Sequence, residues 1–145
     1  MYKQILVPVD GSENAIKALE KAVELAKLTG ARLTILTIYR HHSMLEASFS
    51  MVRVEEPGNM DDIMRGAAKE VAEQAKARAI ELGADNVRAF VKNWPVARHI
   101  ITFAEEHDID LIVIGSRGTG SFENYLLGSV SHKVTGMAKC PVLVV

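Results

Sequence analysis

The chain has 145 residues, of which 48% are hydrophobic and 24% are charged, the proportions of an ordinary globular domain. This composition excludes an intrinsically disordered chain, and the formal net charge of −1 excludes the large positive field that attracts nucleic acid or anionic lipid. The longest apolar runs hold about six residues, too few to cross a bilayer, and the single cysteine, Cys140, excludes an internal disulfide.

The first part of the chain alternates between strand-like and helix-like apolar patterns. Residues 4–9 are a short apolar run that predicts a strand, and a stripe of apolar residues at helical spacing follows from Ala15 to Ala26. Ser12 is suited to cap that helix and Gly30 to end it. Residues 32–39 are rich in β-branched side chains and predict a second strand.

Residues 40–60 form a connection that is much longer than usual between a strand and a helix. The segment mixes apolar side chains such as Met44 and Phe49 with two adjacent histidines, His41 and His42. Two interpretations remain open. The segment packs loosely over the sheet or against a partner subunit, or it forms a lid over a ligand pocket.

The same alternation continues through the second half of the chain. The patterns predict, in order, a helix from Met64 to Leu82, a strand over residues 87–92, a helix marked by Ile100 to His107, a buried strand Leu111–Ile114, a helix from Val130 to Met137 and a closing strand Val142–Val145.

Strands that alternate with helices and read as continuous apolar runs imply an α/β fold with a parallel sheet covered by helices on both faces. Right-handed crossovers favour a doubly wound, five-stranded sheet of order 3-2-1-4-5. Such a sheet binds ligands at the carboxyl ends of its strands, where the strand order reverses between the first and fourth. We expect a single cytoplasmic domain over residues 1–145, because the first residues lack the apolar stretch of a secretory signal.

A glycine- and serine-rich segment follows the fourth expected strand. Gly115 and Gly118 are three residues apart, and nine residues separate Gly118 from Gly128, which precedes Ser129. Glycines in such a turn let the backbone approach a ligand, and the start of a helix offers free N–H groups to an anion. The pattern predicts a phosphate-binding cradle to which Ser129 and Ser131 add hydroxyl groups. The alternative is that the glycines only permit a tight turn and close helix packing.

Asp10 follows the first expected strand and would face the same crevice. A carboxylate beside phosphate oxygens requires a counter-cation, so Asp10 is a candidate contact for magnesium or manganese, directly or through water. Two alternatives stay open: a hydrogen bond to a ribose or adenine group, and a turn aspartate that accepts from local backbone N–H groups. Arg117 is a candidate to neutralise a phosphate or, alternatively, a solvated loop cation.

The motif G-x2-G-x9-G-[ST], the closing run CPVLVV and the N-terminal run ILVPVDGSENA together resemble the universal stress protein family, specifically its ATP-binding subgroup. The resemblance covers the whole chain. It implies the fold of the adenine nucleotide alpha hydrolase-like proteins and a site for ATP with Mg²⁺ or Mn²⁺. It also implies a homodimer formed by antiparallel pairing of the last strand, Val142–Val145, whose apolar edge needs cover.

The resemblance also implies a role for each matching residue of the nucleotide site. Pro8, Val9 and Asp10 would border the adenine and ribose with Asp10 near the metal, Ile38 would pack on the adenine, Ile114 and Gly115 would line the ribose, and Gly118, Gly128, Ser129, Val130 and Ser131 would hold the phosphates.

Four other side chains are interpreted as structural. Trp94 stands in a turn where many family members have Gly-x-Pro, and we expect it to act as a packing anchor. His132 stands where members often carry an acid and is expected to be solvated. His107 lies on the apolar side of its helix and is expected to be partly buried, and Cys140 reads as a small buried hydrophobe.

The chain lacks the P-loop pattern GxxxxGK[ST] and the dinucleotide fingerprint GxGxxG, and no nucleophile–base pair emerges. We therefore predict an ATP-binding stress-response protein that acts as a nucleotide-responsive switch, with no role for nucleic acid or membrane. Mg-ATP would order residues 40–60 and 119–127 and change a surface seen by an unknown protein partner. Alternatives are a slow ATPase or AMP-forming enzyme, a dimeric interaction scaffold with an empty pocket, and a pocket for AMP or cyclic AMP.

Overall fold

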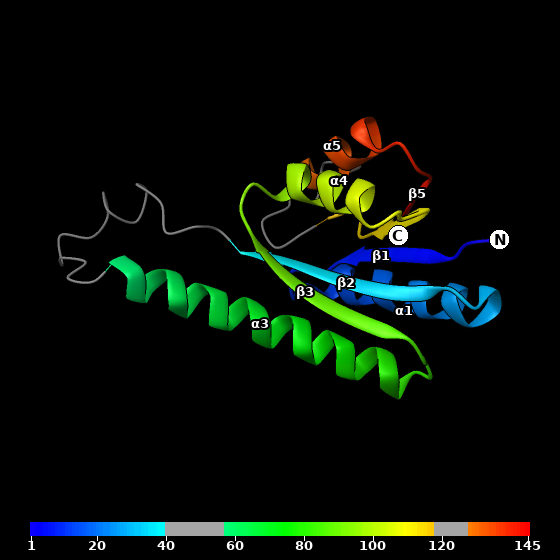
Figure 1. Ribbon diagram of the computed structural model, residues 1–145, viewed down its shortest axis with the longest axis horizontal. Helices are drawn as coiled ribbons and strands as arrows, with labels where there is room; N and C mark the ends of the chain where they lie inside the picture. Colours follow the sequence, from blue (N-terminus) through cyan, green and yellow to red (C-terminus); the bar gives the residue numbers. More distant parts are fainter. Residues whose placement is uncertain (40–56, 118–127) are drawn as a thin grey trace.

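The computed structural model describes residues 1–39, 57–117 and 128–145 (Figure 1). Its strands are β1 (Gln4–Pro8), β2 (Arg32–Tyr39), β3 (Val87–Asn93), β4 (Leu111–Ile114) and β5 (Val142–Val144). Its helices are α1 (Glu13–Thr29), α3 (Pro57–Glu81), α4 (Val96–Glu106) and α5 (Ser129–Met137).

The five strands form one parallel sheet in the order β3-β2-β1-β4-β5, as predicted. Strand β1 is central, with Ile5 opposite Leu33 of β2 on one side and Leu111 of β4 on the other. The chain therefore runs outward from β1 to β3 and then crosses back to β4. This reversal leaves the carboxyl ends of β1 and β4 as neighbours at one edge of the sheet.

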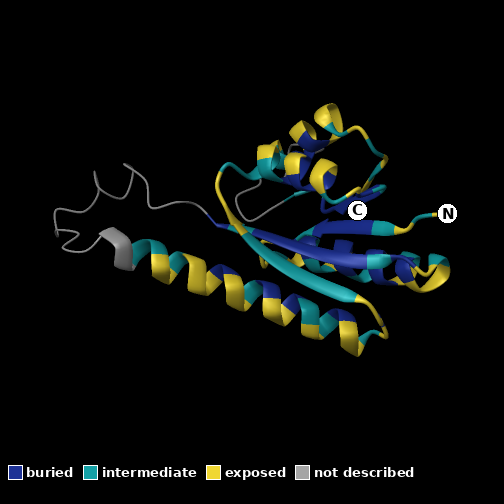
Figure 2. Ribbon diagram, in the orientation of Figure 1, coloured by how far each residue is buried: buried dark blue, intermediate teal, exposed yellow. Residues whose placement is uncertain are grey.

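Two apolar layers hold the helices on the sheet. Odd-numbered residues of β1, such as Ile5, join Leu33 and Ile35 in the layer under α1 and α3. Even-numbered residues, such as Leu6, join Leu36 in the layer under α4 and α5. Figure 1 shows the two helix pairs on opposite faces of the sheet, and Figure 2 shows β1 and β2 largely buried while the edge strand β3 is half-buried.

The ends of α1 follow the predicted capping residues. The Ser12 side chain accepts the N–H of Ala15 at 3.2 Å. Gly30 adopts the left-handed conformation with φ +75°, and its N–H donates to the Ala26 carbonyl at 2.8 Å.

The start of α3 differs from the prediction. The helix begins at Pro57, not near Met64, so the last residues of the predicted connection 40–60 are helical. Proline suits the first turn of a helix because its missing N–H would have no partner there, but the apolar stripe that we used begins later. The interpretations of residues 40–56 and 119–127, and the position of Gly118, lie outside the described residues.

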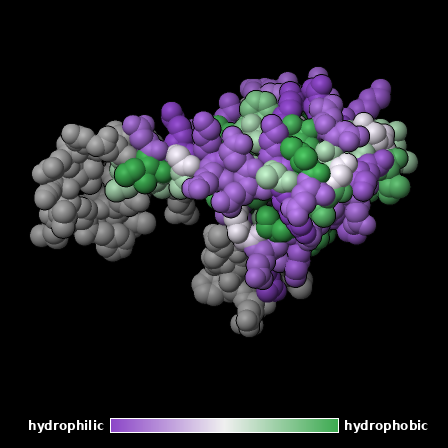
Figure 3. All heavy atoms as spheres, turned by 90° about the horizontal axis from the view of Figure 1, so that it is seen from below, coloured by the Kyte–Doolittle hydropathy of each residue, from purple (hydrophilic) through white to green (hydrophobic). Residues whose placement is uncertain are grey.

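The outer surface on the α3 side is mostly hydrophilic, with separate apolar patches (Figure 3). Large apolar side chains exposed on the helices include Leu28, Ile63 and Ile80. None of the described helices combines the length and apolar character that a membrane crossing requires.

Candidate functional site

The predicted site lies at the edge of the sheet where β1 and β4 end. Asp10 comes two residues after the end of β1, and Gly115 directly follows β4. The two strands pair with each other, so the turns that follow them are neighbours. The N–H of Val9 donates to the Leu36 carbonyl at 2.9 Å, which fixes the start of the first turn against β2.

The turn after β1 is organised by Asp10. Its Oδ1 accepts the N–H of Ser12 at 2.9 Å, and Gly11 between them has φ +87°, which glycine adopts without strain. This contact matches the turn role that we left open for Asp10 and accounts for one carboxylate oxygen. The side chain is exposed at the mouth of the turn.

Close packing against α1 requires glycine at position 115. A Cβ at this position would lie 2.9 Å from the carbonyl oxygen and 3.2 Å from the Cβ of Asn14, in the first turn of α1. The Asn14 amide also donates to Ser116 Oγ at 3.4 Å. For Gly115, the structure therefore supports the close packing that we set beside phosphate binding.

The start of α5 is fixed to the end of β4 by Ser131. This side chain is 3% exposed, and its hydroxyl donates to the Gly115 carbonyl at 2.6 Å. The N–H of Gly128 donates to the carbonyl of Ser116, the residue after Gly115. Sequence reasoning missed the hydrogen bond of Ser131. Ser131 and Gly115 are 16 residues apart, and no sequence pattern pairs the end of a strand with the start of a later helix.

The first turn of α5 presents main-chain donors at this edge. The first bond of the helix runs from the N–H of His132 to the Gly128 carbonyl at 2.9 Å. Within residues 1–39, 57–117 and 128–145, no group accepts the N–H of Ser129, Val130 or Ser131. Free N–H groups and the positive end of the helix dipole make such a turn a binding place for an anion.

The apolar residues of the predicted site divide between the two core layers. Val9 is buried in the layer under α1 and α3, whereas Ile114 is buried under α4 and α5. Ile38 is partly buried in that second layer, near the end of β2. Pro8 and Arg117 are half-buried at the same edge. The structure thus brings these predicted residues to one end of the sheet, and Gly118 lies outside the described residues.

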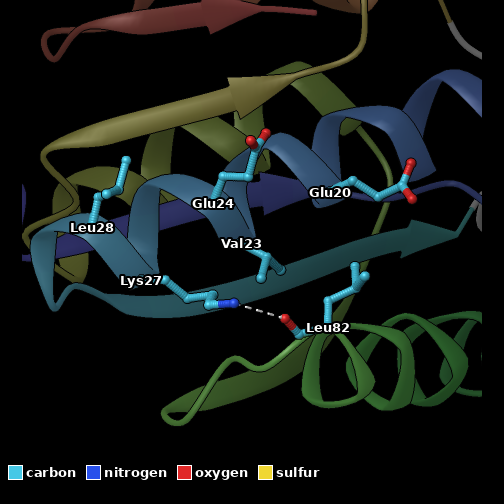
Figure 4. Close-up of a pocket in the computed structure, with 6 residues that line it drawn as sticks. All are labelled: Glu20, Val23, Glu24, Lys27, Leu28 and Leu82. Carbon is cyan, nitrogen blue, oxygen red and sulfur yellow. Dashed lines mark hydrogen bonds between the residues drawn. The ribbon is translucent and has the colours of Figure 1, made fainter.

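A hollow with a volume of about 400 Å³ lies elsewhere, between α1 and the end of α3 (Figure 4). Its lining comprises Glu20, Val23, Glu24, Lys27, Leu28 and Leu82. Lys27 Nζ donates to the Leu82 carbonyl across it at 3.3 Å, so this cation already has a protein acceptor. None of the glycine-rich residues lines this hollow, which sequence reasoning did not predict.

The described residues contain no group of three or more His, Cys, Asp or Glu side chains that could hold a metal ion.

His107 is half-buried and paired, as predicted: its Nδ1 donates to the Phe103 carbonyl at 3.0 Å and its ring stacks on Phe103. Cys140 is half-buried, and burial raises the pKa of its thiol, which favours the protonated form. His132 is exposed, as predicted, but Trp94 is 53% exposed and so anchors less than we expected.

Comparison with known proteins places this geometry in a family. The sequence profile of the Universal stress protein family matches residues 1–145. The chain is 37% identical to universal stress protein YxiE of Bacillus subtilis, over 100% of this chain and 99% of that protein. Universal stress protein UspA from Lactobacillus plantarum has a similar structure, with a TM-score of 0.83 and 29% identity over 99% of this chain and 97% of that one. A universal stress protein solved in complex with cAMP gives a TM-score of 0.74 at 26% identity, over 99% and 96% of the two chains. The chain belongs to the universal stress protein family.

Proposed function

We propose that this protein binds an adenine nucleotide at the carboxyl edge of the sheet, between β1 and β4, and that Mg-ATP is its preferred ligand. The observation that carries the proposal is the first turn of α5, where three main-chain N–H groups have no acceptor among the described residues. The solved relative in complex with cAMP supports nucleotide binding in general.

The phosphates would accept hydrogen bonds from the main chain of α5. Ser131 already donates its hydroxyl hydrogen to Gly115, so its part toward a phosphate falls to its N–H, beside those of Ser129 and Val130. Because the Ser131 bond ties this turn to β4, the donors are held in place before a ligand arrives, which lowers the entropic cost of binding. The family motif implies that Gly118 and Gly128 would also contact the phosphates.

The adenosine part would lie over the ends of β1, β2 and β4. Pro8, Ile38 and Ile114 supply apolar surface there, and the backbone of Val9 and Gly115 allows close approach. Arg117 would add a positive charge near the phosphates.

Asp10 fits a cation that is shared with the nucleotide. Mg²⁺ prefers oxygen ligands and is usually held by one or two carboxylates together with phosphate oxygens and waters. The exposed Asp10 carboxylate lies at the edge where the phosphates would bind, and the described residues hold no group of three or more metal-ligating side chains elsewhere. When bound, Mg²⁺ or Mn²⁺ would neutralise phosphate charge.

We further propose that nucleotide binding acts as a switch in a cytoplasmic homodimer. Strand β5 lies at an open edge of the sheet, and its Leu143 is 37% exposed. An apolar edge strand invites pairing with a second copy. Nucleotide-dependent ordering of segments near the site would then change the surface offered to a protein partner.

The test is a calorimetric titration of nucleotide-free protein with ATP, ADP, AMP and cAMP, each with and without Mg²⁺. The expected result is micromolar binding that is tightest for Mg-ATP. A preference for AMP or cAMP would keep the site and change the ligand. No binding by any of the four would refute the proposal and leave an interaction scaffold. Steady ATP hydrolysis that is lost in Asp10→Ala would instead favour the slow-enzyme alternative.

A further inference from the structure

Two arginines lie side by side at the opposite end of the sheet. Arg32 is the first residue of β2, and Arg88 of β3 is paired in register with Thr34. Arg32 and Thr34 therefore point to the same face of β2, because side chains alternate along a strand. That face also carries Leu36 and Phe90, which belong to the layer under α4 and α5.

The charges of both arginines lack a counter-charge among the described residues. Arg88 donates from Nη2 to Thr34 Oγ1 at 3.4 Å, and its guanidinium lies 5.3 Å from the centre of the Phe90 ring. No ion pair joins Arg32 or Arg88 to a carboxylate in the described part of the chain. The Nε atoms of both side chains are buried without a hydrogen-bond partner.

The carboxylate at this end of β4 is already engaged. Asp110 accepts the N–H groups of Lys3 and Gln4 at 2.9 and 3.0 Å, so it holds the start of β1. The proximity of the two arginines also has an electrostatic effect. Burial, and then the positive charge of Arg32, lower the pKa of the Arg88 guanidinium.

The pair is accessible from solvent. Both residues are half-buried, so each keeps part of its surface exposed, although the Nε atoms are buried. Helix α4 makes few contacts with β2 and β3, whereas α3 packs along both strands on the other face. In Figure 1, the starting ends of β2 and β3 extend beyond α4, and none of the described helices covers this part of the sheet face.

We propose that Arg32 and Arg88 form a binding site for a small tetrahedral oxyanion, namely inorganic phosphate or the phosphate group of a small phosphomonoester. Guanidinium groups donate two parallel hydrogen bonds to such an anion. A phosphate dianion has enough oxygens to accept from two guanidiniums at once and neutralises two positive charges, whereas a single carboxylate neutralises one. The Thr34 hydroxyl and the Phe90 ring hold Arg88 in place for this contact.

This site is separate from the proposed nucleotide site. Arg32 begins β2, and Ile38 lies six residues further along the same strand, roughly 20 Å away at the rise of a parallel strand. The two sites also differ in their main donors, which are two charged side chains at one end and main-chain N–H groups, with Arg117 beside them, at the other. Neither proposal depends on the other.

The test is an NMR titration of the amide signals at low ionic strength and pH 8, where phosphate is a dianion. Inorganic phosphate is added in one arm and glycerol 3-phosphate in the other. We expect both to shift the amides of Arg32, Thr34 and Arg88, and the tighter ligand to identify the source of the phosphate. Shifts confined to residues 128–131 would overturn the proposal.

Three variants and a matched control complete the test. Arg32→Gln and Arg88→Gln should each weaken phosphate binding by about tenfold, the loss expected for charge-assisted hydrogen bonds. Arg78→Gln removes the same charge from an arginine paired with Glu20 on the other face, so it should leave affinity unchanged. Arg32→Lys keeps the charge without the planar fork, and weaker binding by this folded variant would support bidentate recognition. Equal affinities of all variants, or binding of a glutamate-rich peptide in place of phosphate, would overturn the assignment.

Discussion

Replacing Ser129 by proline is expected to weaken nucleotide binding while leaving the fold intact. Ser129 is the first residue of α5, a position that proline tolerates because the helix does not use that N–H. The preceding residue, Gly128, has φ −69° and ψ 166°, the extended conformation that a residue before proline prefers. The substitution thus deletes one donor from the proposed phosphate cradle with little structural cost.

The size of the effect follows from the bond that is lost. A hydrogen bond to a charged group contributes about 1.5–3 kcal/mol, which corresponds to a loss of roughly 10- to 150-fold in affinity for Mg-ATP. Ser129→Ala is the matched control, since it removes the hydroxyl and keeps the N–H. If the main chain carries recognition, the alanine variant should bind much more tightly than the proline variant.

The assay is calorimetric titration of both variants, with thermal unfolding as a check on the fold. A proline variant that melts within a few degrees of the unmodified protein and binds Mg-ATP equally well would refute the assignment of the phosphates to the first turn of α5. Equal losses in the two variants would shift the contact from the N–H to the Ser129 hydroxyl.

Three further outcomes are expected. Gly115→Ala should lower the free energy of unfolding in urea by about 1–3 kcal/mol, because the new Cβ would press on the Asn14 backbone; unchanged stability would contradict that close approach. Asp10→Asn should keep the contact with the Ser12 N–H and reduce the preference for Mg-ATP over metal-free ATP by about tenfold in calorimetry, and an unaltered preference would remove Asp10 from the metal site. Val144→Pro should convert a dimer to a monomer in light scattering. The reason is that Pro141 and Val145 bond to β4, so the odd-numbered residues of this segment face β4 and the N–H of Val144 points to the open edge. A dimer that persists in this variant would exclude pairing through β5.

The parts of the fold that sequence predicted well are those with a local physical cause. The ends of α1 followed from Ser12 and Gly30, because capping depends on residues within one turn. The sheet order followed from the alternation of strands and helices, because parallel strands with right-handed crossovers allow few arrangements. The predicted start of α3 was wrong because the apolar stripe that we used was counted only from Met64, whereas the helix already begins at Pro57.

The details of the candidate site required the tertiary structure. The glycine pattern drew attention to Gly115, but only the packed structure shows that Asn14 occupies the space of its missing Cβ. The arginine pair had no signal in the sequence, because Arg88 meets Thr34 across 54 residues and only the register of β2 and β3 brings them together. Contacts of this kind depend on strand register, which a hydrophobic pattern alone leaves open to a shift by two residues.

The two proposed anion sites should also respond differently to salt, because their donors differ in charge. The arginine pair carries two full positive charges, partly exposed, whereas the first turn of α5 offers main-chain dipoles equivalent to about half a charge, with Arg117 as the one cation proposed nearby. Screening by salt weakens the attraction between exposed full charges most, since the Debye length falls from about 30 Å at 0.01 M to about 10 Å at 0.1 M. In one phosphate titration followed by NMR, the affinity read from the amides of Arg32 and Arg88 should therefore fall more steeply with sodium chloride than that read from Ser129 and Val130. Equal slopes at the two ends of the sheet would mean that full charges contribute equally at both, and the distinction between recognition by two charged side chains and recognition mainly by the main chain would fail.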